Sequence, residues 1–226
     1  MFQDTGIILF SRSAKEEAKF KSLHRHDARN KIVLNKLREH SLKIVERSKI
    51  DYIIYDEKNQ HGFQFSDKLT NAINEAFSKY DKLIVLGADC PELAVSDIKR
   101  AALALQQSNQ VLGLEKKGGA YLIGLQKSNW NPVLFERLAW TTKNLGEQLY
   151  DLLNSCSSVA ILDTKSDINR SVDLLANFIQ AEAKKLIAII KSILFDRQNL
   201  IGQSKKLDFN FIQNSISFRG PPALMS

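Results

Sequence analysis

Several residue types that mark particular protein classes are scarce in this 226-residue sequence. The two cysteines, Cys90 and Cys156, match neither a zinc-binding nor a redox spacing, and a chain of this length with so few excludes a disulfide-stapled mini-protein. Four prolines and ten glycines exclude a collagen-like chain. The longest apolar runs, 186–190 and 193–195, fall far short of the ~20 residues that a membrane-spanning helix needs. With neither a basic leader nor a cleavage site, the sequence predicts a cytoplasmic protein.

Positive charge is concentrated near the N-terminus. The formal net charge is +7, and residues 1–49 hold twelve Lys and Arg against six Asp and Glu. Apolar residues at helical spacing over 27–47 predict a helix whose basic side chains face solvent. The alternatives are that these basic side chains attract a phosphorylated ligand or nucleic acid. Nucleic acid ranks last, because the segment has few interleaved aromatic residues and no recognisable binding motif.

Short apolar runs alternate with segments of helical period, which is typical of an α/β fold. The pattern predicts strands at 6–10, 51–55, 83–87, 110–114, 120–125 and 159–162. It predicts helices at 27–47, at 66–80 with Ser66 as N-cap, at 96–107, in two short stretches after Pro132, and from about Asp167 as far as Phe195. The connection at 115–119 is too short for a crossover helix, so the strands that flank it are antiparallel if they pair. The sheet is therefore expected to be mixed and mainly parallel.

The segment 83–93 (LIVLGADCPEL) carries the sharpest chemical signal. An apolar strand leads into Gly87 and Asp89, and Pro91 then forces a turn. Ligands of open α/β sheets bind beyond the carboxyl ends of the strands. A carboxylate at this position can hold a hard divalent cation against a diphosphate. Asp89 is therefore a candidate metal ligand and catalytic residue, and the alternative is an Asp that caps the following turn.

A second signal is the glycine pair Gly118-Gly119, which lies between two closely spaced strands. Glycine lets the backbone approach a ligand closely. The alternative is an ordinary hairpin turn.

These segments carry a resemblance to a known family. GADCPEL at 87–93, GLEKKGGAYLIGL at 113–125 and AWTT at 139–142, in this order, resemble bacterial GT-A-type glycosyltransferase-like proteins of the nucleotide-diphospho-sugar transferase superfamily. The resemblance covers roughly residues 6–173. It implies a Rossmann-like GT-A three-layer sandwich at 1–195 with an added C-terminal helix. The tail at 196–226 is expected to pack on this domain or on a partner, and a homodimer is possible.

The resemblance also implies an activity and a set of site residues. The activity is transfer of a glycosyl or nucleotidyl group from a nucleotide-activated donor, a nucleotide or nucleotide sugar, to an unknown acceptor. Mg²⁺ or Mn²⁺ is the implied cofactor, with Asp89 and Asp163 as its ligands. The implied nucleotide-binding residues are Phe10, Ser11, Arg12, Lys19, Gly87, Lys117, Gly118, Gly119 and Tyr121.

Two departures from the family pattern bear on activity. The loop after the first strand, 13–23, lacks the family's Gly and Pro, and Lys19 or Lys21 are the only substitutes for its lysine. Lys117 stands where the family has an aspartate, and an ammonium cannot bind a metal ion as a carboxylate does. One hypothesis is that Lys116 or Lys117 neutralises phosphate directly, without a metal. The alternatives are a catalytically degenerate protein that binds a nucleotide or a partner, and a basic nucleic-acid-binding module.

Overall fold

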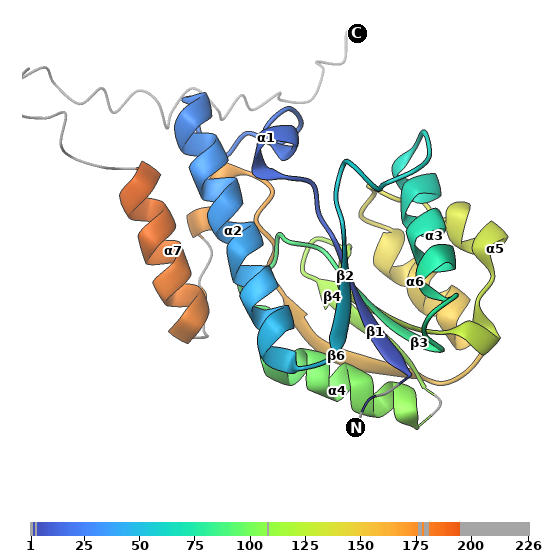
Figure 1. Cartoon of the computed structure of the whole chain (residues 1–226). Coiled ribbons are helices and arrows are strands. Elements are labelled where there is room, and N and C mark those ends of the chain that lie inside the picture. The colour runs from blue at the N-terminus through green and yellow to red at the C-terminus, as the bar shows by residue number, and fades with distance from the viewer. Residues whose placement is uncertain (1, 3, 108, 176–177, 179–180, 195–226) are drawn as a thin grey trace, which may run out of the picture. The chain divides into compact units, whose positions relative to one another are not determined.

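In a computed structural model, the chain forms an α/β fold around one six-stranded sheet (Figure 1). The structure describes residues 2, 4–107, 109–175, 178 and 181–194. The strands are β1 (Thr5–Phe10), β2 (Asp51–Tyr55), β3 (Lys82–Leu86), β4 (Gln110–Glu115), β5 (Ala120–Gln126) and β6 (Val159–Lys165). They lie in the order β2-β1-β3-β5-β4-β6, and β5 is antiparallel to both of its neighbours. The prediction of a mixed, mainly parallel sheet is confirmed.

Helices cover both faces of the sheet (Figure 1). They are α1 (Ala14–Glu17), α2 (Asp27–Ser48), α3 (Phe65–Ala76), α4 (Val95–Gln106), α5 (Pro132–Glu136), α6 (Leu145–Asn154) and α7 (Ala181–Leu194). Short 3₁₀ turns occupy Lys127–Asn129 and Ser171–Leu175.

The strand β1, second in the sheet, shows why the sheet is buried on both sides. Successive side chains of a strand point to opposite faces. Ile7 and Leu9 pack with residues of α2 and α4, while Ile8 packs with residues of α3. All three side chains are fully buried. Such double burial explains why β1 is a continuous apolar run rather than an alternating one.

The start of α3 differs from the prediction. The Asp67 carboxylate accepts a hydrogen bond from the Gln64 backbone N–H at 3.1 Å, so the helix begins at Phe65 and Ser66 is not its N-cap. A carboxylate at the third helical position that reaches back in this way satisfies a free N–H of the first turn.

The C-terminal helix is shorter than predicted. It begins at Ala181, not near Asp167, because residues 167–175 form a loop that holds two carboxylates against Lys117. Ile187 and Ile190 of α7 are buried with Val33 and Leu37 of α2. The apolar stripe of α7 therefore packs on the domain itself. The predicted tail at 196–226 lies outside the described residues.

Within the part of the chain that the structure describes, the helices are too short or too polar to cross a membrane.

Candidate functional site

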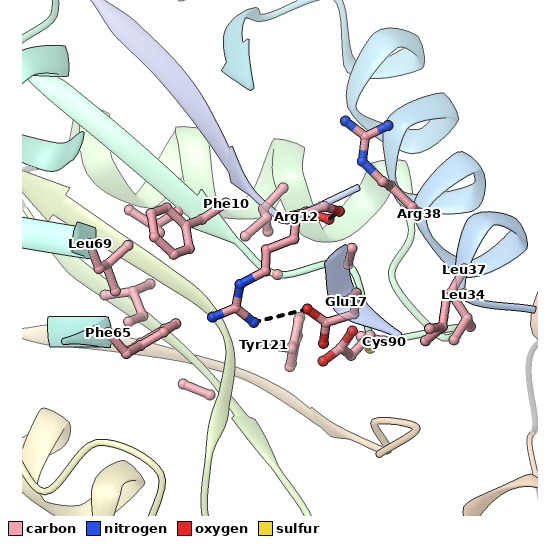
Figure 2. Close-up of a pocket in the computed structure, with 18 of the residues that line it drawn as sticks. Phe10, Arg12, Glu17, Leu34, Leu37, Arg38, Phe65, Leu69, Cys90 and Tyr121 are labelled. Carbon is pink, nitrogen blue, oxygen red and sulfur yellow. Dashed lines mark hydrogen bonds and ion pairs between the residues drawn. The ribbon is translucent and has the colours of Figure 1, made fainter. Parts of the chain in front are cut away.

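A cavity of about 240 Å³ opens at the carboxyl ends of β1 and β3, where the sequence predicts a ligand (Figure 2). Its walls come from the segments that follow β1, β2 and β3, from the helices α1, α2 and α3, from β4 and β5, and from Trp140. The lining residues are Phe10, Ser11, Arg12, Ala14, Glu17, Leu34, Leu37, Arg38, Gln60, Phe65, Leu69, Val85, Leu86, Gly87, Ala88, Asp89, Cys90, Glu115, Ala120, Tyr121, Ile123 and Trp140.

One wall of the cavity is aromatic. The rings of Phe10 and Phe65 meet edge to face with centroids 5.6 Å apart, and Phe65 lies 5.4 Å from Trp140. The indole N–H of Trp140 donates a hydrogen bond to the Phe135 carbonyl at 2.9 Å, which fixes the ring. The backbone turns directly after it, where Thr141 has a φ of 71°, a conformation that β-branched residues rarely adopt. Flat apolar surfaces of this kind suit a planar ring such as a nucleobase.

On the opposite side, the cavity is lined by two apolar residues of α2, Leu34 and Leu37, and by the charged residue Arg38 (Figure 2). Between the two walls, the Arg12 guanidinium lies 3.1 Å from the Glu17 carboxylate and stacks over the Phe20 ring at 4.5 Å. These two contacts hold Arg12 in place at the cavity.

Gly87 leaves open space at the end of β3. A Cβ added there would meet nothing within 4 Å, so the backbone itself faces the cavity. A ligand can therefore approach this segment closely.

Asp89, the predicted metal ligand, is paired with a lysine. Its carboxylate lies 2.9 Å from the ammonium of Lys21, whose side chain is only 7% exposed. The Asp89 carbonyl accepts a hydrogen bond from the Ile168 N–H at 2.9 Å. Buried Asn30 holds the Lys21 loop by donating to the Lys21 carbonyl at 2.8 Å. Tertiary contacts thus position both members of the pair.

Glu115 lies in the cavity wall and was not singled out by the sequence. Burial, followed by the negative charge and hydrogen bond of Asp167, raises the pKa of Glu115 to about 8. The group is therefore mostly protonated at neutral pH and can donate a hydrogen bond. Its place at the end of β4, beside the glycine pair, was the available signal in the sequence.

Lys117 and the glycine pair lie outside the cavity lining. The Lys117 ammonium is 3.2 Å from Asp167 and 2.7 Å from Asp173. Gly118 has a φ of +90°, and a Cβ there would overlap the Lys143 carbonyl. Its own carbonyl accepts a hydrogen bond from the Gly146 N–H at 2.8 Å. These contacts show that Gly118 lets the β4–β5 hairpin pack against the start of α6.

The remaining predicted residues fall into two groups, those that line the cavity and those that lie outside it. Phe10, Ser11, Arg12, Gly87, Asp89 and Tyr121 come together in the cavity lining. Lys19 is outside it, with its ammonium 2.6 Å from Glu16. Asp163 is also outside it, and its exposed carboxylate pairs with Arg100 at 2.7 Å. The role of each residue stays a prediction.

Basic side chains of α2 pair with acidic neighbours. Lys31 contacts Asp27, Lys36 lies 2.9 Å from Glu39, and Arg47 lies 3.2 Å from Glu182. This pattern favours the interpretation of a solvated helix face over a surface for nucleic acid.

Comparison with known proteins shows which family the sequence matches and which solved structures resemble its fold. Residues 20–142 match the model of a family described as "Uncharacterized protein conserved in bacteria" (DUF2064). Comparison with curated protein sequences gave no significant match.

Two solved structures share the fold. One is a protein of Desulfovibrio desulfuricans G20 that has been assigned to the nucleotide-diphospho-sugar transferases, with 17% identity, a TM-score of 0.71, and coverage of 85% of this chain and 97% of its own. The other is the 4-diphosphocytidyl-2C-methyl-D-erythritol synthase of Anaerococcus prevotii DSM 20548, with 11% identity, a TM-score of 0.51, and coverage of 84% and 97%. The predicted GT-A-like α/β fold of the nucleotide-diphospho-sugar transferases is confirmed.

Proposed function

The chain belongs to the DUF2064 family, and from this premise we propose that it is a transferase that binds a nucleotide-activated donor in the cavity beside β1 and β3. The group transferred is a glycosyl or a nucleotidyl group. The fold shared with a protein assigned to the nucleotide-diphospho-sugar transferases supports this class of reaction.

The observation that carries the proposal is the composition of the cavity. An aromatic wall of Phe10, Phe65 and Trp140 lies next to the open backbone at Gly87 and the guanidinium of Arg12. A nucleotide has the same division into a planar base and a charged phosphate chain. We propose that the base packs on the aromatic wall and that the phosphates lie over Gly87, towards Arg12.

The size of the cavity fits part of such a donor. Ligand pockets usually measure about 300–1,000 Å³, and this cavity measures about 240 Å³. We propose that it holds the nucleotide end of the donor and that the transferred group lies outside it, within reach of an acceptor. The chemistry is then positioning of the two substrates and neutralisation of the charge that develops on the leaving phosphate.

A thermal-shift screen against nucleoside triphosphates and nucleotide sugars tests the proposal, since a ligand that binds the native state raises its Tm. We expect one base to be preferred. Gly87→Ala is the matched variant, because its methyl group meets open space in the protein and the Tm without ligand should not change.

A methyl group forced against a bound ligand costs about 1–3 kcal/mol, which corresponds to a roughly five- to hundred-fold higher Kd. Calorimetric titration of wild type and Gly87→Ala measures this difference. Equal affinity of the two proteins, or the lack of any nucleotide-dependent shift in wild type, would contradict the proposal.

The Asp89–Lys21 ion pair supports a second candidate, a protein that binds nucleotide without catalysis, because the carboxylate is already neutralised within the chain. Assays for released pyrophosphate or nucleoside diphosphate across a panel of acceptors distinguish the two candidates. Binding without release in every assay favours the second.

A further inference from the structure

The carboxylates at the edge of the sheet raise the question of whether this site fits a divalent cation. Mg²⁺ and Mn²⁺ need several free oxygen ligands directed at one point. Asp89, Asp167 and Asp173 are the carboxylates near the ends of β3 and β6 whose surroundings decide the answer. Over the described residues, His, Cys, Asp and Glu side chains form no group of three or more suited to a metal ion.

The first carboxylate already has a cation. The Lys21 ammonium lies 2.9 Å from Asp89, and with 7% of its side chain exposed it is buried against that oxygen. Removing an ammonium from water is costly unless a partner of opposite charge compensates it. Lys21 and Asp89 therefore stabilise each other in the absence of any ligand.

The second and third carboxylates share one cation. Lys117 lies 3.2 Å from Asp167 and 2.7 Å from Asp173, and these two side chains are only 2% and 8% exposed. The hydrogen bonds from the Asn169 and Arg170 N–H groups to Asp173, both 2.8 Å, hold this loop closed. The half-exposed Lys117 side chain thus places an ammonium between two buried carboxylates, where a free carboxylate pair would attract a metal ion.

We infer that Lys21 and Lys117 are built-in counter-cations for the carboxylates at the sheet edge, so that the cavity takes up its ligand without Mg²⁺ or Mn²⁺. The residues present do not fit a divalent metal. The part of this inference that concerns the ligand rests on the proposed function, whereas the part that concerns the metal does not.

The inference changes the role that the sequence suggests for Lys117. Its ammonium neutralises carboxylates of the chain and not phosphate. The cations that line the cavity are Arg12 and Arg38. Arg12 is paired with Glu17, while Arg38 forms no ion pair with any residue that the structure describes. We therefore assign the charge that attracts an anionic ligand to Arg38, with Arg12 beside it.

Mn²⁺ alone, added to the wild-type protein without nucleotide, tests the metal part. Electron paramagnetic resonance measures free Mn²⁺ directly. We expect no bound Mn²⁺ at submillimolar concentration, and any nucleotide-induced rise in Tm should be the same in EDTA as in Mg²⁺. Submillimolar Mn²⁺ binding that is lost in Asp89→Asn would overturn the inference.

Lys21→Met provides the positive test, because methionine keeps the unbranched apolar chain and removes the ammonium. We expect this variant to bind Mn²⁺ at least tenfold more tightly than wild type, and Lys21→Met/Asp89→Asn to lose that gain. Lys19→Met is the control, since Lys19 is exposed and pairs with Glu16. Unchanged Mn²⁺ affinity in a folded Lys21→Met protein would count against the inference.

The wild-type measurement needs no variant, so it decides the matter even where Lys21→Met fails to fold. The outcomes also separate the two proposals. If wild type binds no nucleotide but Lys21→Met gains Mn²⁺ binding, the inference of a built-in cation stands and the proposed function fails. If the nucleotide-induced rise in Tm disappears in EDTA, the proposed function stands and the inference of metal-independent binding fails.

Discussion

At the residue scale, the buried carboxyl group of Glu115 makes stability depend on pH. Its pKa is about 8 in the folded protein, against an ordinary value of 4.5, first because of burial and then because of Asp167. A raised carboxyl pKa stabilises the fold fully below the unfolded value. That stabilisation is lost as pH rises through the folded value, because the folded protein must then bury a charge.

Glu115→Gln removes this titration and keeps a hydrogen-bond donor for Asp167. We expect the difference in Tm, Glu115→Gln minus wild type, to increase from pH 5 to pH 8.5. This increase should correspond to at least about 1.4 kcal/mol in the free energy of unfolding, which is the equivalent of one pKa unit. Thermal unfolding over this pH range measures the difference. Glu46→Gln, at an exposed site on α2, is the control and should show none. A constant difference between Glu115→Gln and wild type would contradict the assignment.

Phe65 and Phe63 form a matched pair for testing the aromatic wall. Phe65 lines the cavity against Phe10 and Trp140, whereas Phe63, two residues earlier, is 98% exposed and outside the lining. We expect Phe65→Ala to raise the Kd for nucleotide about five- to hundred-fold, because stacking on an aromatic ring contributes about 1–3 kcal/mol per base. Phe63→Ala should bind as wild type does in the same calorimetric titration. Equal losses in the two variants would show that the base packs elsewhere.

The residues that the sequence could place share one property, which is that they lie at the end of a strand or shortly after it. Asp89 is found from the apolar run that precedes it, whereas Phe10 and Arg12 come from the resemblance to a known family. The parallel arrangement of β1 and β3 brings all three to one edge of the sheet. Lys21 and Glu115 could not be placed in this way. Their neighbours, Asp89 and Asp167, lie far from them in sequence, so only the folded structure pairs them.

At the scale of elements, the hairpin between β4 and β5 is locked to α6 through glycine. The backbone of Gly118 meets the Lys143 carbonyl and accepts a hydrogen bond from Gly146, at a φ that L-residues with side chains rarely adopt. We expect Gly118→Ala to lower the free energy of unfolding by about 1–3 kcal/mol, through strain and overlap together. Denaturant unfolding measures this loss.

Gly87→Ala serves as the comparison for Gly118→Ala, since it adds the same methyl group in open space and should leave stability unchanged. If Gly118→Ala proved as stable as Gly87→Ala, the hairpin would not be held by this contact. The sequence favours a hairpin glycine here and leaves a ligand-binding glycine as the other possibility, because glycine pairs are usual between closely spaced antiparallel strands. The contact with α6, which follows later in the chain, supports the hairpin interpretation of Gly118, and its ligand-binding role stays a prediction.

The length of elements was harder to predict than their existence. The strands and the helices α2 and α4 lie close to their predicted ranges, because apolar periodicity continues over each whole element. Residues 167–175 belong to the predicted C-terminal helix but form no α-helix, and Ser171–Leu175 form a 3₁₀ turn. Lys117 draws Asp167 and Asp173 inward, and a local pattern contains no information about such a distant partner.

At the scale of the whole molecule, the sheet has two halves that follow the order of the chain. Residues up to Leu86 supply β2, β1 and β3, and later residues supply β5, β4 and β6. The pairing of β3 with β5 joins the halves, and its partners Val85 and Ile123 both line the cavity. The mixed fold class was predictable because chain order and connection length constrain it strongly. The position of the cavity across this junction follows only from the assembled sheet.

This junction has a consequence for the growing polypeptide. A chain that has left the ribosome only as far as the loop after β3 already has Phe10, Arg12 and Asp89, but Tyr121 and Trp140 have not yet emerged. A bound small molecule can stabilise only states that contain its complete site. A ligand of this cavity would therefore give no help to early folding and would add its stabilisation in one step, once translation has passed Trp140 and the second half of the sheet has docked on the first.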